Sequence, residues 1–146
     1  MRVDHVFAAA IAVASAGAAP ARAQNSALPP PLTQNGVSYL CGGVGSDDAA
    51  AMKRAAARHN LMLTFATRSG NFVSGVDVDI RDGRGRSLLK TTCDGPIMLV
   101  DVPKGGRYRI YGDIDGRTTS AEAQVGPDSK GKAVHLVLPG EAAGQG

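Results

Sequence analysis

The feature that most constrains this chain of 146 residues is a series of short alternating segments separated by turn residues. The clearest part lies between residues 75 and 116, where Val76, Val78 and Ile80 alternate with charged residues. A two-residue period places the aliphatic side chains on one face of a strand and the charges on the other. Glycine, proline and aspartate punctuate the pattern at residues 82–85, 94–96, 103–106 and 115–116, so strands joined by tight turns are predicted.

Four further segments continue the β pattern, three of them outside residues 75–116. Residues 61–67 and 133–138 alternate between apolar and smaller or polar residues, and residues 118–125 form a weaker, small-residue strand suited to an edge. Residues 97–102 are apolar almost throughout, which predicts a strand that is covered on both faces or bulged. About seven short strands at regular spacing predict a mainly β fold, an antiparallel Ig-like or transthyretin-like β-sandwich.

One α-helix is predicted near the N-terminus of this domain. Ser46 is a candidate N-cap, Asp47 and Asp48 suit the positive first turn, and Arg58 and His59 suit the negative last turn before Asn60. The segment is rich in alanine, and its sizeable apolar side chain is Met52. We therefore expect the helix to depend on packing against the sheet.

The N-terminal residues have the pattern of a secretory signal peptide. Arg2 precedes a small-residue apolar run at 6–19, and Ala21-Arg22-Ala23 provides the small-x-small site, which predicts cleavage after Ala23. The run is shorter than the roughly 18 apolar residues that a membrane span needs. We expect a periplasmic or secreted protein without a membrane span in the mature chain.

The rest of the chain divides by composition. Residues 24–36 are polar and proline-rich and predict a flexible leader, and residues 140–146 predict a disordered tail. Residues 37–139 then make a single β-sandwich domain with a helical extension.

Several short motifs occur in a distinctive order within that domain. They are Val-Asp-Val-Asp-Ile-Arg-Asp-Gly-Arg-Gly at 76–85, Thr-Cys-Asp-Gly at 92–95, Val-Pro-Lys-Gly at 102–105 and then Tyr108. In this order they resemble the carboxypeptidase regulatory-like domain, a transthyretin-like sandwich, over residues 72–138. Two departures are an extra glycine before Tyr108 and Val102 in place of the usual leucine. The resemblance implies a non-catalytic module.

The chain has two cysteines, Cys41 before the helix and Cys93 at a strand end. In an exported protein an even cysteine number indicates a disulfide, which would tie the extension to the sandwich. Buried free thiols are the alternative, and a redox pair is disfavoured because there is no Cys-x-x-Cys motif.

Composition and spacing argue against several function classes. The net charge is +3 and the basic residues are scattered along the sequence, so no nucleic-acid partner is expected. His59 and His135 lie far apart, and Asp113 with Asp115 lacks the further ligands of a calcium loop, so no metal and no cofactor are expected. No nucleophile motif is present, and we expect no catalytic residues and no enzyme.

The charged face of the sheet is the predicted binding surface, and it carries Asp77, Asp79, Arg107, Arg109 and Tyr111. We expect a module that binds or supports another envelope protein through this face. A carbohydrate-binding module is the alternative, suggested by Tyr111 but weakened because the chain has no Trp. The alternative without a binding function is a solvated face on which the aspartates pair with Arg107 and Arg109 across the strands.

Overall fold

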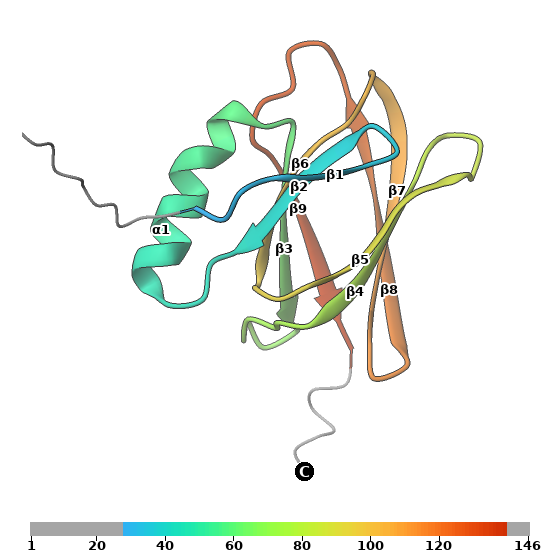
Figure 1. The fold of residues 1–146 in the computed structure, drawn as a ribbon. Helices are drawn as coiled ribbons and strands as arrows, with labels where there is room; N and C mark the ends of the chain where they lie inside the picture. Colours follow the sequence, from blue (N-terminus) through green and yellow to red (C-terminus); the bar gives the residue numbers. More distant parts are fainter. Residues whose placement is uncertain (1–27, 140–146) are drawn as a thin grey trace, which may run out of the picture.

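The computed structural model describes residues 28–139, which form two sheets packed face to face with a helix on the outside (Figure 1). One sheet has the strand order β1-β2-β6-β3-β9, and the other has the order β5-β4-β7-β8. The mainly β, sandwich-like prediction is therefore confirmed. The elements within these residues are β1 Leu32–Gln34, β2 Val37–Gly42, α1 Ser46–Ala55, the 3-10 turn Ala56–Arg58, β3 Leu61–Thr67, β4 Val76–Arg81, β5 Ser87–Cys93, β6 Ile97–Asp101, β7 Gly106–Ile114, β8 Arg117–Val125 and β9 Lys132–Leu138.

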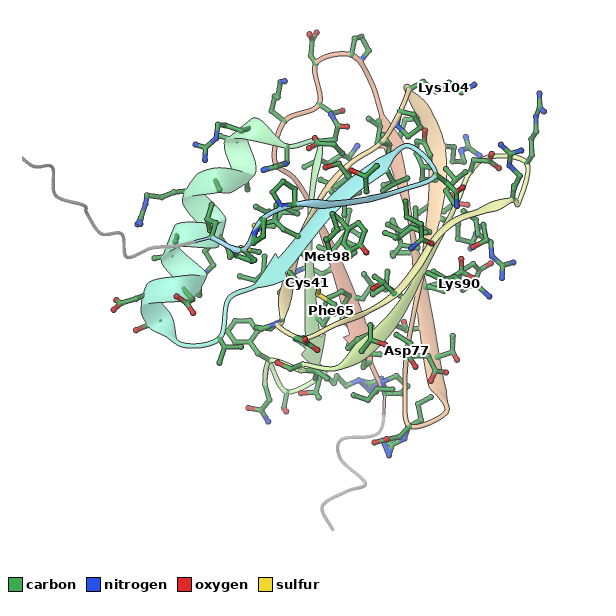
Figure 2. The ribbon with its side chains drawn as sticks, in the orientation of Figure 1. Cys41, Phe65, Asp77, Lys90, Met98 and Lys104 are labelled. Atoms are coloured by element: carbon green, nitrogen blue, oxygen red, sulfur yellow. A yellow bond between two sulfur atoms is a disulfide. The ribbon has the colours of Figure 1, made fainter. Side chains whose placement is uncertain are left out.

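The main core lies between the two sheets and follows the alternation seen in the sequence. Val76, Val78 and Ile80 of β4 are buried in this core. Phe65 of β3 is fully buried near its centre (Figure 2). Burial of a side chain of this kind contributes roughly 1.5–3 kcal/mol. The opposite face of the four-stranded sheet remains in solvent, which is what leaves its charged residues available.

The strand β6 is covered on both faces, as its unbroken apolar run predicted. Met98 and Val100 point into the main core between the sheets. Ile97 and Leu99 point outward and pack beneath α1, where they contact Met52 in a second, smaller core. The helix thus depends on this apolar strip, because an isolated helix of its length has little stability in water.

The ends of the helix differ from the prediction. Gly45, with a φ of 91°, precedes the helix, Ser46 is its first residue, and no side chain caps it. The helix ends at Ala55, and the next three residues form a 3-10 turn, so Arg58 and His59 lie beyond its last turn. The backbone at His59 is extended because the following residues turn toward β6.

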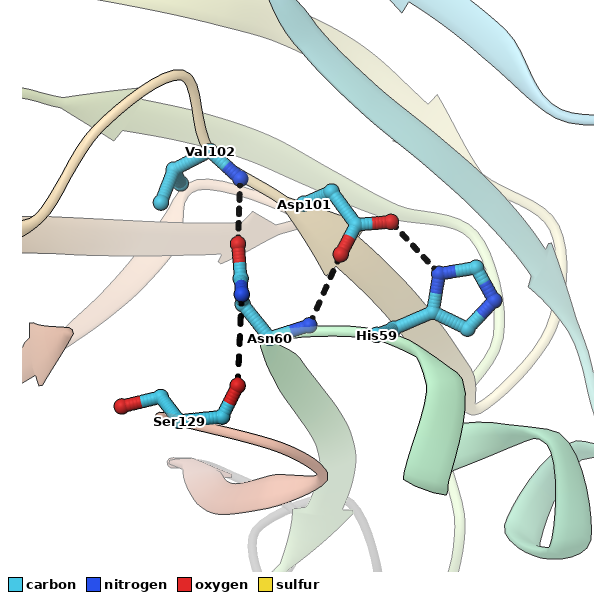
Figure 3. Close-up of polar contacts among 5 residues, drawn as sticks. All are labelled: His59, Asn60, Asp101, Val102 and Ser129. Carbon is cyan, nitrogen blue, oxygen red and sulfur yellow. Dashed lines mark hydrogen bonds and ion pairs between the residues drawn. The ribbon is translucent and has the colours of Figure 1, made fainter. Parts of the chain in front are cut away.

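Polar contacts with β6 hold the chain where it leaves the helix (Figure 3). Asp101 accepts a hydrogen bond from the backbone N–H of Asn60 at 2.8 Å and lies 2.7 Å from Nδ1 of His59. The Asn60 side chain accepts a hydrogen bond from the Val102 backbone and donates one to the Ser129 carbonyl. One polar cluster therefore joins the helix end, β6 and the loop before β9.

The structure has more strands than predicted, and the additional pair is the hairpin of β1 and β2. Leu32–Gln34 and the turn at 35–36 fall in the segment expected to be a leader, and Val37–Gly42 precedes the helix. Asn35 and Gly36 have φ values of 49° and 83°, the left-handed backbone of a tight hairpin turn. The Asn-Gly pair was thus the sequence signal for this hairpin.

The pairing of β9 is an exception to the antiparallel arrangement. β9 runs parallel to β3 along its whole length, with Leu63 beside Val134 and Phe65 beside Leu136. The other strand pairs among residues 28–139 are antiparallel. Parallel pairing arises because the chain crosses from the edge of one sheet at β8 to the edge of the other at β9.

The disulfide predicted between Cys41 and Cys93 is confirmed. It joins β2 of one sheet to β5 of the other, with a Cα–Cα distance of 5.5 Å. The bond thus links the two sheets covalently. The predicted signal peptide with Ala21 and Ala23, residues 24–27 of the leader and the predicted tail lie outside the described residues.

Candidate functional site

The solvent-facing side of the four-stranded sheet carries the five predicted binding residues. Asp77 and Asp79 belong to β4, and Arg107, Arg109 and Tyr111 belong to β7. The strand register decides which of them meet. Asp77 lies opposite Asp113, and Asp79 lies opposite Tyr111. The aspartates therefore do not face Arg107 and Arg109, so the expected cross-strand pairs of opposite charge are absent at these positions.

A groove of about 510 Å3 runs over this face, and we call it the sheet groove. It contains three of the predicted residues, Asp77, Asp79 and Tyr111, whereas Arg107 and Arg109 lie nearer one end of the sandwich. The other groove residues come from β4, β5, β7 and β8, and they are Val78, Arg81, Lys90, Thr91, Thr92, Asp113 and Thr118. Asp77 and Lys90 are labelled on this side of the molecule in Figure 2.

Asp79 is the carboxylate of the groove that is tied most firmly into the protein. Its Oδ2 accepts hydrogen bonds from Nη2 and Nε of Arg81 at 2.9 and 3.1 Å, and its Oδ1 accepts one from Ser87 at 2.7 Å. Partial burial acts to raise the pKa of Asp79, but the bonds from Arg81 and Ser87 outweigh it and lower that pKa. Asp79 is therefore ionised and structurally engaged.

Asp77 and Asp113 are held differently, by hydroxyl groups and, at Asp113, also by the Gly116 backbone N–H at 3.2 Å. Thr92 donates a hydrogen bond to Asp77 at 2.5 Å, and Thr118 donates one to Asp113 at 2.7 Å. Within the part of the chain that the structure describes, neither carboxylate has an ion-pair partner. Two like charges directly opposite across a sheet destabilise it. The groove thus contains a negative pair that the described residues leave uncompensated.

The next like-charged pair on the same two strands is compensated. Arg81 lies opposite Arg109. Arg81 pairs with Asp79 at 2.9 Å, and Arg109 pairs with Glu122 of β8. The sheet therefore neutralises its basic cross-strand pair with its own carboxylates and leaves the acidic pair open to solvent.

Tyr111 forms the aromatic part of the groove. The guanidinium of Arg81 lies over its ring, with Cζ 5.0 Å from the centroid, which is a cation–π geometry. Because Arg81 is also bonded to Asp79, the three side chains form one ordered unit. Tyr111 is half-buried by these contacts.

Several groove residues were not among the predicted binding residues. Asp113 was considered with Asp115 as part of a calcium loop, and its position beside Asp77 depends on the register of β4 with β7. Lys90 and Thr92 enter through the pairing of β5 with β4. Arg81 continues the charged alternation of β4, so the strand period was the signal that indicated it.

The histidines and cysteines lie away from the groove. His59 is bonded to Asp101 at the helix end, His135 is exposed on β9, and both cysteines are in the disulfide. Among residues 28–139, His, Cys, Asp and Glu form no group of three or more able to hold a metal ion. No helix within the same residues has the length and apolar character to cross a membrane.

No family model matches this chain, and no curated protein matches it. Among solved structures, the chain is similar to S.CueP, described in a crystal structure, with a TM-score of 0.40 and 15% sequence identity. That match covers 53% of this chain and 62% of the other, so this chain spans less than two thirds of the S.CueP chain. A TM-score of 0.40 supports no transfer of function.

Proposed function

We propose that the protein is an exported, non-catalytic β-sandwich module that binds another protein of the cell envelope through the sheet groove. The observation that carries this proposal is the uncompensated pair of Asp77 and Asp113 inside the groove. A basic side chain of the partner, placed between these carboxylates, would remove the repulsion. The groove would then gain the charge balance that the neighbouring Arg81 and Arg109 already have.

Export is supported by the disulfide and by the signal-peptide pattern before Gln24. Disulfides persist in oxidising compartments and are rare in the cytosol. The bond between Cys41 and Cys93 joins the two sheets of the described domain. The motif order over residues 72–138, which is similar to the carboxypeptidase regulatory-like domain, also supports a binding module with a periplasmic or extracellular location.

A non-catalytic role is supported by how the reactive side chains are used. Both cysteines form the disulfide, and Nδ1 of His59 is bonded to Asp101. The groove contains carboxylates and threonine hydroxyls, and Thr92 and Thr118 donate their hydroxyl hydrogens to Asp77 and Asp113. These contacts order the groove as a binding surface.

Carbohydrate binding is the second candidate function, and Tyr111 is the observation that favours it. An aromatic ring beside carboxylates and hydroxyl groups is the chemistry that recognises sugars. Against it, Arg81 already lies over the Tyr111 ring, so one aromatic face is occupied within the protein. Sugar-binding platforms normally use several rings, and the chain has three Tyr, three Phe and no Trp.

Capture from an envelope fraction tests the proposal and separates the two candidates. The bait is the exported protein, compared with Asp77→Asn/Asp113→Asn and with the control Asp115→Asn/Asp128→Asn, which makes the same charge change outside the groove. We expect a protease-sensitive partner on the bait and the control, and its loss from the groove variant. Equal capture by all three baits would refute the groove as the site. A glycan retained after protease treatment, and lost with Tyr111→Ala, would favour the carbohydrate-binding alternative instead.

A further inference from the structure

Basic side chains that are scattered in the sequence gather around a second pocket, at one end of the sandwich. The pocket has a volume of about 550 Å3, and we call it the basic pocket. It is formed by the β1–β2, β4–β5 and β6–β7 turns, which lie at the same end of the molecule in Figure 1. Its charged lining residues are Arg84, Arg86, Lys104 and Arg107, with Asp82 as the one carboxylate among the described residues that line it.

The basic groups of this pocket are largely without partners. Within residues 28–139, Arg84, Lys104 and Arg107 have no ion-pair partner. Arg86 approaches Asp82 only to 4.0 Å, and the Arg86 side chain is 75% exposed. An exposed ion pair at that distance contributes little to stability and neutralises little of the charge of Arg86. The pocket therefore has a surplus of positive charge.

Asp82 is used by the backbone of its own turn. Its Oδ1 accepts hydrogen bonds from the backbone N–H groups of Arg84 and Arg86 at 2.9 and 3.0 Å. The bond from Arg86, together with that from Arg84, lowers the pKa of Asp82. The carboxylate thus fixes the β4–β5 turn, and the guanidinium groups of Arg84 and Arg86 remain in solvent.

The walls of the pocket are fixed before any ligand arrives. Tyr108 donates a hydrogen bond from its hydroxyl to the Lys104 carbonyl at 2.6 Å, which holds the β6–β7 turn. A methyl group added at Gly105 would lie 2.9 Å from the Val125 carbonyl oxygen, so this turn packs closely on the end of β8. One added at Gly36 would lie 3.5 Å from Pro103. A preorganised site loses less entropy on binding than a mobile one.

We propose that the basic pocket binds a small, multiply charged phosphate compound. Arginine guanidinium groups suit phosphate oxygens because their planar donors bond in pairs, and lysine adds a point charge. The volume lies within the range of roughly 300–1,000 Å3 found for small-molecule sites. The pocket has four basic groups and one carboxylate, so it favours a multiply charged anion. A ligand with a single carboxylate would leave most of the positive charge of the pocket uncompensated.

This pocket is separate from the sheet groove. The two share no lining residue, and the charged side chains of the sheet groove include three aspartates. The proposal therefore does not depend on the function proposed for the groove. The phosphate can belong to a soluble compound or to a lipid headgroup, and we assign the soluble form because the site is a pocket between turns.

The test is titration of the full exported protein with inorganic pyrophosphate, followed by calorimetry and by amide shifts in NMR spectra. The pocket variant is Arg84→Gln/Arg107→Gln, and the control is Arg54→Gln/Arg58→Gln on the helical segment, which removes the same charge. All four side chains are exposed, so both variants should fold. Succinate serves as the dicarboxylate comparison, and phosphatidylglycerol vesicles serve as the lipid comparison.

We expect saturable pyrophosphate binding with shifts at residues 82–86 and 104–107, and affinity at least about tenfold weaker in the pocket variant than in the control. Succinate should bind more weakly than pyrophosphate. The proposal is overturned if pyrophosphate does not saturate, if the control loses as much affinity as the pocket variant, or if succinate binds equally well. Binding to vesicles without binding to pyrophosphate would also overturn it, because the contact would then be a surface and not the pocket.

Discussion

Replacing Asp77 and Asp113 by asparagine should make the free protein more stable, although both residues lie in an ordered site. The two carboxylates are opposite each other on β4 and β7 and have no ion-pair partner among the described residues. Asparagine at position 77 keeps an oxygen that accepts the hydrogen bond from Thr92, so Asp77→Asn removes only the repulsion. Asp113 accepts bonds on both oxygens, from the Gly116 backbone N–H and from Thr118, so Asp113→Asn also gives up one of these bonds. A cross-strand pair of this kind is worth about 0.2–1 kcal/mol.

The assay is urea denaturation of the wild type, the two single variants and the double variant. Asp77→Asn should gain about 0.2–1 kcal/mol. Asp113→Asn and the double variant should gain less, because the same repulsion cannot be removed twice and Asp113→Asn also loses a hydrogen bond. The gain should shrink in high salt, since the Debye length falls from roughly 30 Å at 0.01 M to roughly 3 Å at 1 M.

Asp79→Asn is the matched comparison from the same strand and the same groove. Asp79 is bonded to Arg81 and Ser87, so its neutralisation should lower stability by about 1 kcal/mol or more. If Asp77→Asn lowers stability as Asp79→Asn does, the carboxylate of Asp77 has a structural role. The argument that Asp77 and Asp113 are present for a partner would then be refuted.

Three further predictions concern the fold. The Cys41–Cys93 bond closes a separation of 52 residues, so its reduction should lower the free energy of unfolding by about 4 kcal/mol. Urea denaturation with and without reductant measures this loss, and a loss below about 1 kcal/mol would contradict a stabilising role of the cross-link. The pKa of Asp79 is lowered in the folded state. Ionised Asp79 therefore stabilises the fold at pH values above its unfolded pKa, and this stabilisation is lost as the pH falls through its folded pKa. The difference in stability between the wild type and Asp79→Asn should therefore close below about pH 4 in acid titrations. A difference that widens there would mean that folding raises the pKa of Asp79 and does not lower it. Gly95→Ala should cost about 3 kcal/mol or prevent folding, because a methyl group there would lie 2.2 Å from the Gly42 carbonyl oxygen. Gly126→Ala, where nothing lies within 4 Å, should change the melting temperature little, and equal effects of the two would refute this packing argument.

The strand alternation predicted most of the sandwich because its period follows directly from which face is buried. Val76, Val78 and Ile80 are buried where the pattern placed them, and β3 begins and ends at the predicted residues, 61 and 67. The hairpin of β1 and β2 was missed because β1 has only three residues, two of them exposed, and so gives too short a pattern. The helix end was misplaced because Asp101, far along the chain, draws His59 and Asn60 toward β6.

The candidate sites were less accessible to sequence analysis because they depend on register. Strand period placed Asp77, Asp79 and Tyr111 on one face, but only the pairing of β4 with β7 brings Asp113 opposite Asp77. The basic pocket shows the same limit more strongly. Arg84 and Arg107 come from different turns, and the sequence shows them as isolated charges.

Carboxylate footprinting on the captured complex tests whether the partner binds at Asp77 and Asp113 in the sheet groove. Labelling with a carbodiimide and a small amine reports the accessibility of each carboxylate, residue by residue, in the free and bound protein. If a basic group of the partner enters the sheet groove, labelling of Asp77 and Asp113 should fall at least about tenfold in the complex, while Asp115 and Asp128 label as before. Labelling of Asp77 and Asp113 at the same rate in the free and bound protein would contradict the account.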